Sequence, residues 1–535
     1  MSSGGGVEVT VSGDPLVQAR DSALAPLVED GLATALAAKD PTLWGPDARA
    51  EAGIRLGWLD APATSRELLG RLAALRGELA EEGLDHIVLA GMGGSSLAPE
   101  VICKTAGVEL TVLDTTDPGQ VRAALSDRLE RTLVVVSSKS GGTIETDSHR
   151  RAYTQAFRDA GVTDPGRRFV TVTDPGSPLE HTARAEGFRE IFLADPEVGG
   201  RYSALTAFGL VPSALAGADV SALLDEAAAL SAVLAGSTGN PALELGAVLG
   251  GAGNAGLDKV VLADGGSGIS GFGDWAEQLI AESTGKQGRG LLPVVVGGPG
   301  GPGAQPGSDR HLVVLGPPAD SGAAHSNVSG ALGGQFLAWE YATAVAGRIM
   351  GINPFDQPNV TESKENTARI LQSGRPEQSP ILVDGAVEVY ADPRLVGAAK
   401  DVPGVVRALL EGVPARGYLA VMAYLDRRAD GAAAGLRDVL AGRTERSVTF
   451  GWGPRFLHST GQYHKGGPAV GAFLQVTGAV QQDLPIPGRD YTFGALQAAQ
   501  AAGDREALTG RGRPLLHLHL TDRAEGLRQL LQAVR

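Results

Sequence analysis

The chain has one cysteine, few aromatic residues and no long apolar segment. Cys103 is the single cysteine among 535 residues, which excludes an internal disulfide and a cysteine-rich metal site and suits a reducing compartment. No uninterrupted apolar run is long enough to cross a bilayer. The first residues, MSSGGG, lack the charged and apolar regions of a signal peptide. We therefore expect a soluble, cytoplasmic protein.

Basic residues are also in short supply. The chain has 46 Lys and Arg against 61 Asp and Glu, a formal charge of −15. This balance argues against nucleic acid or an anionic membrane as a partner. An anionic substrate must then be met by a few local cations.

The chain alternates apolar strands with amphipathic helices from residue 85 onward, which predicts an α/β fold with parallel sheets. The length suits two or three domains. We expect an N-terminal arm and helices (1–84), a first parallel-sheet domain (85–215), a second (216–370) and a C-terminal α/β block that completes the second domain and the active site (371–535).

Apolar and β-branched runs predict the strands, and three-to-four spacing of apolar residues predicts the helices. The expected strands are 7–11, 87–90, 110–113, 132–136, 169–172, 259–262, 418–424, 448–451, 472–477 and 515–520. The expected helices are a helical region over 22–82 and the segments 222–235, 275–282, 336–350, 433–440 and 493–502. Residues 297–307 read as a Gly/Pro-rich loop.

Two turns rich in Ser and Gly follow predicted strands: GMGGSS at 91–96 and SSKSGGTIET at 137–146. Backbone N–H groups, small hydroxyls and a helix N-terminus can together hold a phosphate. The fingerprint G-x-G-x-x-G is absent because residue 96 is serine, and no Walker lysine follows. The alternative is that each is an ordinary strand–loop–helix turn. The presence of two Ser-rich turns on neighbouring strands favours a sugar phosphate over a nucleotide as the ligand.

These two turns resemble the phosphate loops of phosphoglucose isomerases, which are built on two sugar-isomerase (SIS) domains. The resemblance extends over residues 85–535. It implies that Ser95, Ser138, Lys139, Ser140 and Thr143 bind the substrate phosphate, and that Gly94 also contacts the substrate.

Glu282 and Arg201 stand in two further motifs. ESTGK at 282–286 follows a predicted helix that Gly285 ends. A carboxylate near a helix C-terminus meets the negative end of the helix dipole, which suits a general base, although a solvated glutamate is the simpler reading. In GGRYS at 199–203, glycines leave room for the arginine to reach an oxyanion, although a surface ion pair is equally open. The resemblance makes Glu282 the base for the C1–C2 proton and Arg201 the group that stabilises the enediolate, with Gly200 beside the substrate.

The segment FDQPNVTESK at 355–364 resembles the family pattern Phe-Asp-Gln-x-Gly-Val-Glu-x-x-Lys. The resemblance makes Gln357 a phosphate ligand and places Lys364 near the ring oxygen. Asn359 replaces a glycine, and because asparagine tolerates a left-handed backbone we expect the turn to survive. Thr361 replaces a glutamate, which puts a supporting contact in doubt.

LHSTGQ at 457–462 resembles the segment that carries the ring-opening histidine, here His458. In the bacterial isomerases this segment precedes the Phe-Asp-Gln segment, whereas here it follows about ninety residues after Lys364. We expect that the block moved to the C-terminus and that His458 kept its place beside Glu282. A loop histidine without a role is the alternative, and the roles of His464 and Lys465 stay open.

His517 and His519 alternate with leucines on a predicted strand, but no third metal ligand is evident beside them. We expect no metal and no cofactor. The resemblance implies interconversion of glucose 6-phosphate and fructose 6-phosphate by a homodimer. Two alternatives stay open: an isomerase that also accepts mannose 6-phosphate, and a non-catalytic SIS module that senses sugar phosphates.

Overall fold

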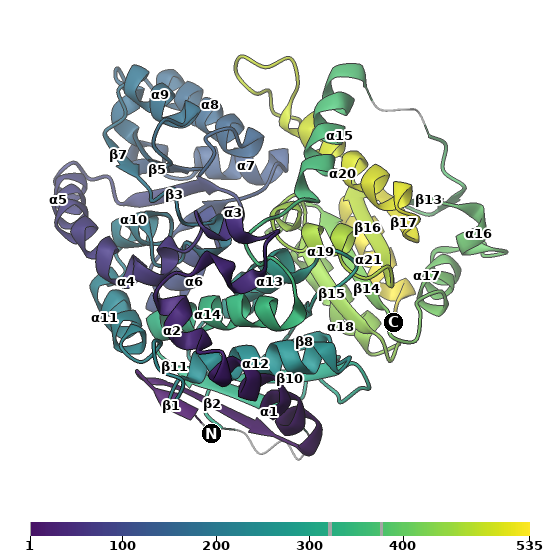
Figure 1. The fold of residues 1–535 in the computed structure, drawn as a ribbon. Helices are drawn as coiled ribbons and strands as arrows, with labels where there is room; N and C mark the ends of the chain where they lie inside the picture. Colours follow the sequence, from purple (N-terminus) through teal and green to yellow (C-terminus); the bar gives the residue numbers. More distant parts are fainter. Residues whose placement is uncertain (1, 319–323, 375–377) are drawn as a thin grey trace.

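The computed structural model describes residues 2–318, 324–374 and 378–535, and its strands form three sheets (Figure 1). The sheets are mostly parallel and flanked by helices, which confirms the predicted α/β class. The described strands after residue 371 pair with one another in the third sheet. The domain boundaries given above remain predictions.

The first sheet consists of five parallel strands in the order β4-β3-β5-β6-β7. They are His86–Gly91 (β3), Thr111–Leu113 (β4), Thr132–Ser137 (β5), Phe169–Thr173 (β6) and Glu190–Leu193 (β7). Helices cover both faces, so the central strands read as continuous apolar runs. One face packs on Pro118–Ser126 (α7), Ile144–Asp159 (α8) and Pro178–Ala185 (α9), the other on Leu68–Glu81 (α5), Leu97–Ala106 (α6) and Ala207–Ala216 (α10).

The second sheet has the order β1-β2-β11-β10-β8-β9. Its four parallel strands are Lys259–Asp264 (β8), Leu292–Val296 (β9), Arg310–Leu315 (β10) and His325–Gly330 (β11). The N-terminal strands Ser2–Gly4 (β1) and Val7–Ser12 (β2) extend it, with β2 antiparallel to β11, so the predicted arm strand becomes part of this sheet. Its helices are Asp14–Glu29 (α1), Val220–Ser231 (α11), Pro241–Asn254 (α12), Phe272–Thr284 (α13) and Leu332–Met350 (α14).

The third sheet repeats this plan in the order β12-β13-β17-β16-β14-β15. Its parallel strands are Tyr418–Tyr424 (β14), Ser447–Trp452 (β15), Gly471–Gly478 (β16) and Leu515–Leu520 (β17), and Leu382–Asp384 (β12) and Val387–Ala391 (β13) add antiparallel. Val402–Glu411 (α17), Gly435–Ala441 (α18) and Arg523–Ala533 (α21) pack on one face.

The other face of the third sheet shares a hydrophobic core with the second sheet. Val261 and Val294 of the second sheet lie in the same buried cluster as Tyr418 and Phe473 of the third. Gly461–Gly466 (α19) and Phe493–Gly510 (α20) contribute residues to this cluster. Sheet-on-sheet burial therefore holds the C-terminal block in place.

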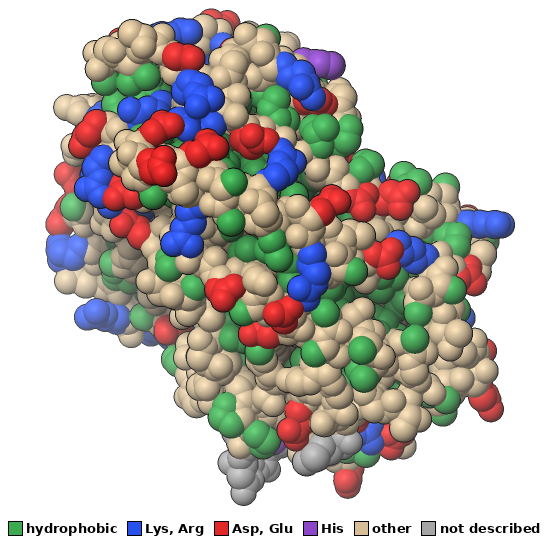
Figure 2. All heavy atoms as spheres, turned by 90° about the vertical axis from the view of Figure 1, so that its left-hand side faces the viewer, with side chains coloured by type: hydrophobic (Ala, Val, Ile, Leu, Met, Phe, Trp, Pro, Cys, Tyr) green, Lys and Arg blue, Asp and Glu red, His purple; other side chains and the backbone are tan. Residues whose placement is uncertain are grey.

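The remaining helices connect these layers. They are Leu32–Ala37 (α2), Arg49–Ala52 (α3), Ala61–Thr64 (α4), Val360–Ser373 (α15) and Pro393–Val396 (α16). The predicted loop 297–307 joins β9 to β10. Among the described residues no helix is long and apolar enough to cross a membrane. On the face drawn in Figure 2, basic and acidic side chains are interspersed.

Helices α12 and α14 pack so closely at Gly246 that a larger residue there should destabilise the fold. A Cβ atom on Gly246 would lie 2.6 Å from Cβ of Val345 and 2.8 Å from the carbonyl oxygen of Ala342. Gly246→Ala should therefore destabilise the fold by about 1–3 kcal/mol through overpacking. Gly77 in α5 has no atom within 4 Å of such a Cβ, so Gly77→Ala should stabilise by about 0.5–1 kcal/mol. Denaturant unfolding measures the free energy of unfolding of both variants. Changes of the same sign in the two variants would contradict the packing argument.

Candidate active site

The two Ser-rich loops lie side by side. Gly91 at the end of β3 pairs with Ser137 at the end of β5, so both loops leave the carboxyl edge of the first sheet, where ligands of such sheets bind. The first loop runs into α6 and the second into α8. Two helix N-termini and two sets of loop N–H groups are thereby brought to one edge.

The second loop is held in shape by its own hydroxyls. Ser138 Oγ lies 2.9 Å from Thr143 Oγ1 and accepts from the Gly141 N–H at 3.2 Å, while Ser140 Oγ accepts from the Gly142 N–H. Lys139 Nζ donates to Asp174 Oδ2 at 2.6 Å and to the Pro196 carbonyl at 3.2 Å. A phosphate here would compete with Asp174 for Lys139.

The first loop approaches the Arg201 segment closely enough to require glycine. A Cβ on Gly94 would lie 1.9 Å from the carbonyl oxygen of Gly200, which is backbone and cannot move aside cheaply. Ser95, next in the loop, is buried. Two glycines that the sequence places about a hundred residues apart are thus in direct contact, and they set the first loop beside Arg201.

The Arg201 side chain connects three of the predicted motifs. Its Nε donates to Ser283 Oγ at 2.8 Å and its Nη1 to Gln357 Oε1 at 2.8 Å. Nη2 donates to the carbonyl oxygens of Pro354 and Asp356. Only 3% of the residue is exposed, so it serves as an interior hub and not as a surface ion pair.

Glu282 lies beside this hub, near the C-terminus of α13, which ends before Gly285 as the sequence predicts. Its Oε1 is 3.4 Å from Arg201 Nη1. Its Oε2 accepts from Gln278 Nε2 at 3.0 Å, and the same amide donates to the carbonyl oxygen of His458 at 2.8 Å. Gln278 is a site residue that the sequence argument missed, although its place one helical turn before Glu282 could have indicated it.

His458 therefore reaches this site within a single chain. Its Nε2 lies 3.0 Å from Glu145 Oε1, and Gln500 of α20 donates to the same oxygen at 2.7 Å. Burial alone would raise the pKa of Glu145, but the His458 charge and hydrogen bond, with a smaller effect of Lys364, hold that pKa below its usual value. Glu145 was also missed, although it stands inside the second loop motif.

The segment that follows His458 is tied to the 355–364 segment. Gln462 donates to the Gly285 carbonyl at 2.9 Å and to Asn359 Oδ1 at 2.8 Å, and accepts from the Asn359 N–H at 2.9 Å. Asn359 does not use the left-handed backbone that asparagine tolerates, since its φ is −95°. Its side-chain amide, which a glycine lacks, bonds Gln462 instead.

Lys364 and Gln357 are exposed. Lys364 lies on α15 and makes no hydrogen bond or ion pair with the described residues. Its charge is close enough to Glu145 to lower the pKa of that carboxyl. The arrangement thus combines an anion-binding edge, a buried arginine beside a carboxylate, and a histidine–carboxylate pair.

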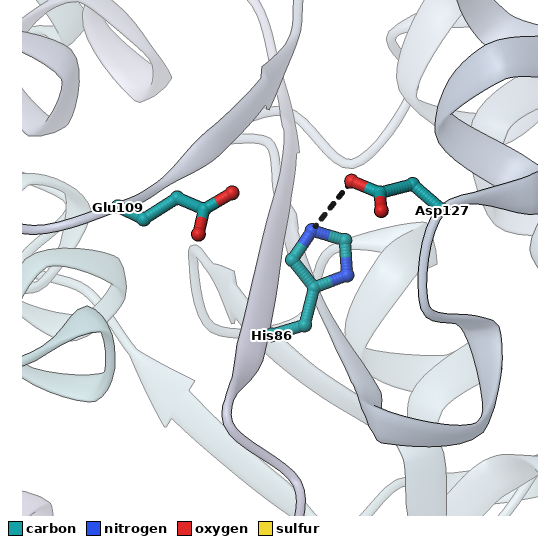
Figure 3. Close-up of side chains that lie close together, drawn as sticks. All are labelled: His86, Glu109 and Asp127. Atoms are coloured by element: carbon teal, nitrogen blue, oxygen red, sulfur yellow. Dashed lines mark ion pairs between the residues drawn. The ribbon is translucent and has the colours of Figure 1, made fainter.

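A separate cluster of His86, Glu109 and Asp127 has the spacing of metal ligands (Figure 3). Arg128 donates to both carboxylates, and the two His86 ring nitrogens lie 2.8 and 3.1 Å from the Thr132 and Thr111 hydroxyls. The cluster is at the amino ends of the strands, on the opposite edge from the loops. Its groups are already matched to one another, and this set indicates an ion-pair network.

The two histidines of β17 lie away from this site. His517 Nε2 and His519 Nδ1 each lie 2.8 Å from Thr477 Oγ1, and the His517 ring stacks on Tyr390. His464 is buried among aromatic rings, and Lys465 Nζ is 2.6 Å from Asp504 Oδ1.

Comparison with known proteins connects part of the chain to one family. Residues 71–244 match the family model for phosphoglucose isomerase. The glucose-6-phosphate isomerase of Synechococcus elongatus is 38% identical over 222 residues, which are 39% of this chain and 42% of the relative. Glucose-6-phosphate isomerase 1, chloroplastic, of Arabidopsis thaliana is 36% identical over 218 residues, 38% of this chain and 35% of the relative. The chain thus spans about two fifths of the length of the curated relatives it matches.

Solved structures show a similar fold. A hypothetical protein of Thermus thermophilus is 26% identical with a TM-score of 0.57, over 68% of this chain and 99% of that one. A glucose-6-phosphate isomerase from Chlamydia trachomatis is 20% identical with a TM-score of 0.55, over 70% of this chain and 90% of that one.

The buried Lys286 should make the stability of the protein depend on pH. Its Nζ donates to the backbone carbonyls of Asn353 and Asp356 and to Asp356 Oδ1. Burial, together with the Arg201 charge, lowers the pKa of Lys286 to about 8 although Asp356 opposes this shift. Between that pH and the unfolded-state pKa of 10.5, the unfolded chain binds more protons. Below about pH 8 the buried lysine is charged in the folded protein, and the full cost of burying that charge lowers the free energy of unfolding. Above that pH the folded protein loses the proton, and the free energy of unfolding rises.

The free energy of unfolding of the wild type, relative to Lys286→Met, should rise by up to about 1.4 kcal/mol per pH unit over that window. Denaturant titrations between the two pKa values and below them measure the difference. A difference that is constant or falls with pH would contradict the assignment.

Proposed function

We propose that this chain, whose residues 71–244 match the phosphoglucose isomerase family, interconverts D-glucose 6-phosphate and D-fructose 6-phosphate. The observation that carries the proposal is the convergence of Glu282, Arg201 and His458 through Gln278, beside two loops suited to a phosphate. An aldose–ketose isomerase needs an anion site, an acid–base group for the ring oxygen, and a base for the carbon-bound proton.

The phosphate would bind at the carboxyl edge of the first sheet. Ser95, Ser138, Ser140 and Thr143 offer hydroxyls there and Gly94 leaves room. Lys139 would exchange Asp174 for the phosphate, and Gln357 would contribute its amide. Because the chain carries a formal charge of −15, this local set of N–H groups and one cation has to supply the attraction.

His458 and Lys364 would open the sugar ring. The carboxylate of Glu145 faces His458 Nε2 at 3.0 Å, which fixes the orientation of the imidazole ring. The imidazole can then give a proton to the ring oxygen while the C1 hydroxyl loses its proton, so that the ring bond breaks and the aldehyde forms. Lys364, whose charge also acts on Glu145, would stabilise charge on the departing oxygen.

Glu282 would then move the proton between carbons. It removes the C2 proton of the open-chain aldose, the electrons shift toward O1, and a cis-enediolate forms. Arg201, 3.4 Å from Glu282, would stabilise its negative charge. Glu282 then returns the proton to C1. The proton of the O2 hydroxyl passes to O1, O2 becomes the carbonyl oxygen, and the ketose results. All of these groups belong to the chain, so we propose no metal and no cofactor.

The ligand that we propose is a sugar phosphate. We also propose that the protein is a cytoplasmic homodimer, as the family resemblance implies. Within one chain His458 already contacts Gln278, so a partner subunit is not needed to supply it. A non-catalytic sugar-phosphate sensor would need the two loops but neither the Glu282 carboxylate nor Arg201. Coupled assays on glucose 6-phosphate and mannose 6-phosphate side by side separate the narrow isomerase, the broader isomerase and the sensor.

Glu282→Gln should keep substrate binding and lose about 10²–10⁴-fold in turnover, because the amide cannot accept the C2 proton. Calorimetry with glucose 6-phosphate measures binding, and exchange of the C2 proton with deuterated water measures the chemical step. Glu277→Gln on the same helix is the control and should stay near the wild type. Intact proton exchange in Glu282→Gln would refute the base assignment.

His458→Ala should affect a ring-closed substrate selectively. Turnover of fructose 6-phosphate should fall by about 10²–10⁴-fold, whereas 5-deoxyfructose 6-phosphate, which cannot close its ring, should react nearly as with the wild type. His181→Ala, at an exposed position of α9, controls for removal of a histidine. Equal losses on both sugars would leave His458 without a role in ring opening.

A further inference from the structure

Arg455 opens the short 3-10 helix Arg455–His458 (η9) that carries the proposed ring-opening histidine. Its guanidinium binds two carboxylates from the first sheet and its helices. Nε donates to Asp114, directly after β4, and Nη2 donates to Glu100 of α6. These partners are 341 and 355 residues away in the sequence, and all three side chains are buried.

The charges in this contact are balanced. Arg427, just after β14, lies 3.3 Å from Glu100 and 3.8 Å from Asp114. Burial alone would raise the pKa of Glu100, but Arg455 and Arg427 outweigh it and hold that pKa well below its usual value. Two arginines from the C-terminal block thus face two carboxylates from the first sheet and its helices. Lys104 also lies 2.9 Å from Glu100, and Asp274 lies 3.8 Å from Arg455.

The contact also reaches the first Ser-rich loop. Ser96 Oγ lies 3.5 Å from the Asp114 carboxylate and donates to the Gly93 carbonyl at 3.1 Å. Gly93 has a φ of +57°, and a Cβ there would lie 2.9 Å from the carbonyl oxygen of His458. From the two ends of one helical turn, Arg455 therefore reaches this loop through Asp114, and His458 reaches it through its carbonyl oxygen.

We propose that Arg455 is a positioning residue for ring opening: its fork on Glu100 and Asp114 seats η9 against the first loop, so that His458 meets Glu145. This role rests on the proposed isomerase function. Only non-covalent contacts place this late segment at the first sheet. A planar guanidinium that bridges two carboxylates with two of its donors fixes an orientation that a point charge such as lysine does not.

The test uses the full chain with Arg455→Met, Arg455→Lys and the double variant Glu100→Gln/Arg455→Met. The matched control is Arg437→Met, because Arg437 is also buried in the C-terminal block and donates to the carbonyls of Val295 and Pro302, away from the site. Each protein is assayed for thermal unfolding and for turnover of fructose 6-phosphate and of ring-free 5-deoxyfructose 6-phosphate.

Arg455→Met should lower the ratio of ring-closed to ring-free turnover by about 100-fold, since a small displacement of a catalytic group has that effect. Arg455→Lys should give an intermediate ratio. The double variant removes one charge of each sign, so it should recover thermal stability relative to Arg455→Met but keep the low ratio. Arg437→Met should leave the ratio unchanged even if it unfolds earlier.

Two results overturn the inference in distinguishable ways. If the wild type turns over neither sugar, the proposed function falls and the positioning role falls with it. If the wild type is active and the double variant recovers stability and the turnover ratio together, Arg455 is a structural residue and the isomerase assignment stands.

Discussion

The site depends on the burial of one cation, Arg201. A guanidinium in the interior is stable only when its donors are matched, because an unpaired buried charge costs several kcal/mol. Arg201 meets this demand with the hydroxyl of Ser283, the amide of Gln357 and the carbonyls of Pro354 and Asp356. The end of α13 and the turn before α15 are consequently held together, and Glu282 is brought to the arginine that its proposed chemistry needs.

The same requirement acts where the C-terminal block meets the first sheet. Arg455 and Arg427 cross to Glu100 and Asp114, while the apolar faces of the second and third sheets bury one another. The apolar contact stabilises the packing of the two parts but is not directional, whereas the paired charges fix their relative orientation. A segment placed late in the chain can thereby occupy a specific position in an early domain.

The similarity to phosphoglucose isomerases covers the two Ser-rich loops. The matched residues 71–244 contain both loops, Glu145 and Arg201, whereas Glu282, Lys364 and His458 lie beyond them. The geometry connects Glu282 and His458 to the matched part of the chain. Gln278 donates to both residues, Arg201 lies 3.4 Å from Glu282, and His458 pairs with Glu145.

The sequence alone determined many of the local elements, although the apolar strands β9 and β10 were not predicted. β14 and β17 begin and end where their apolar runs predict, and α13 ends at Gly285, because periodicity and helix-stop signals act over a few residues. Polar strands such as β11, with the sequence HSNVSG, carry no such signal, and neither do the partners of distant side chains. Only the tertiary structure decided that Gln278 joins Glu282 to His458, that Asn359 bonds Gln462, and that Arg455 reaches Glu100. Those contacts depend on burial and charge pairing between segments that lie up to hundreds of residues apart in the sequence.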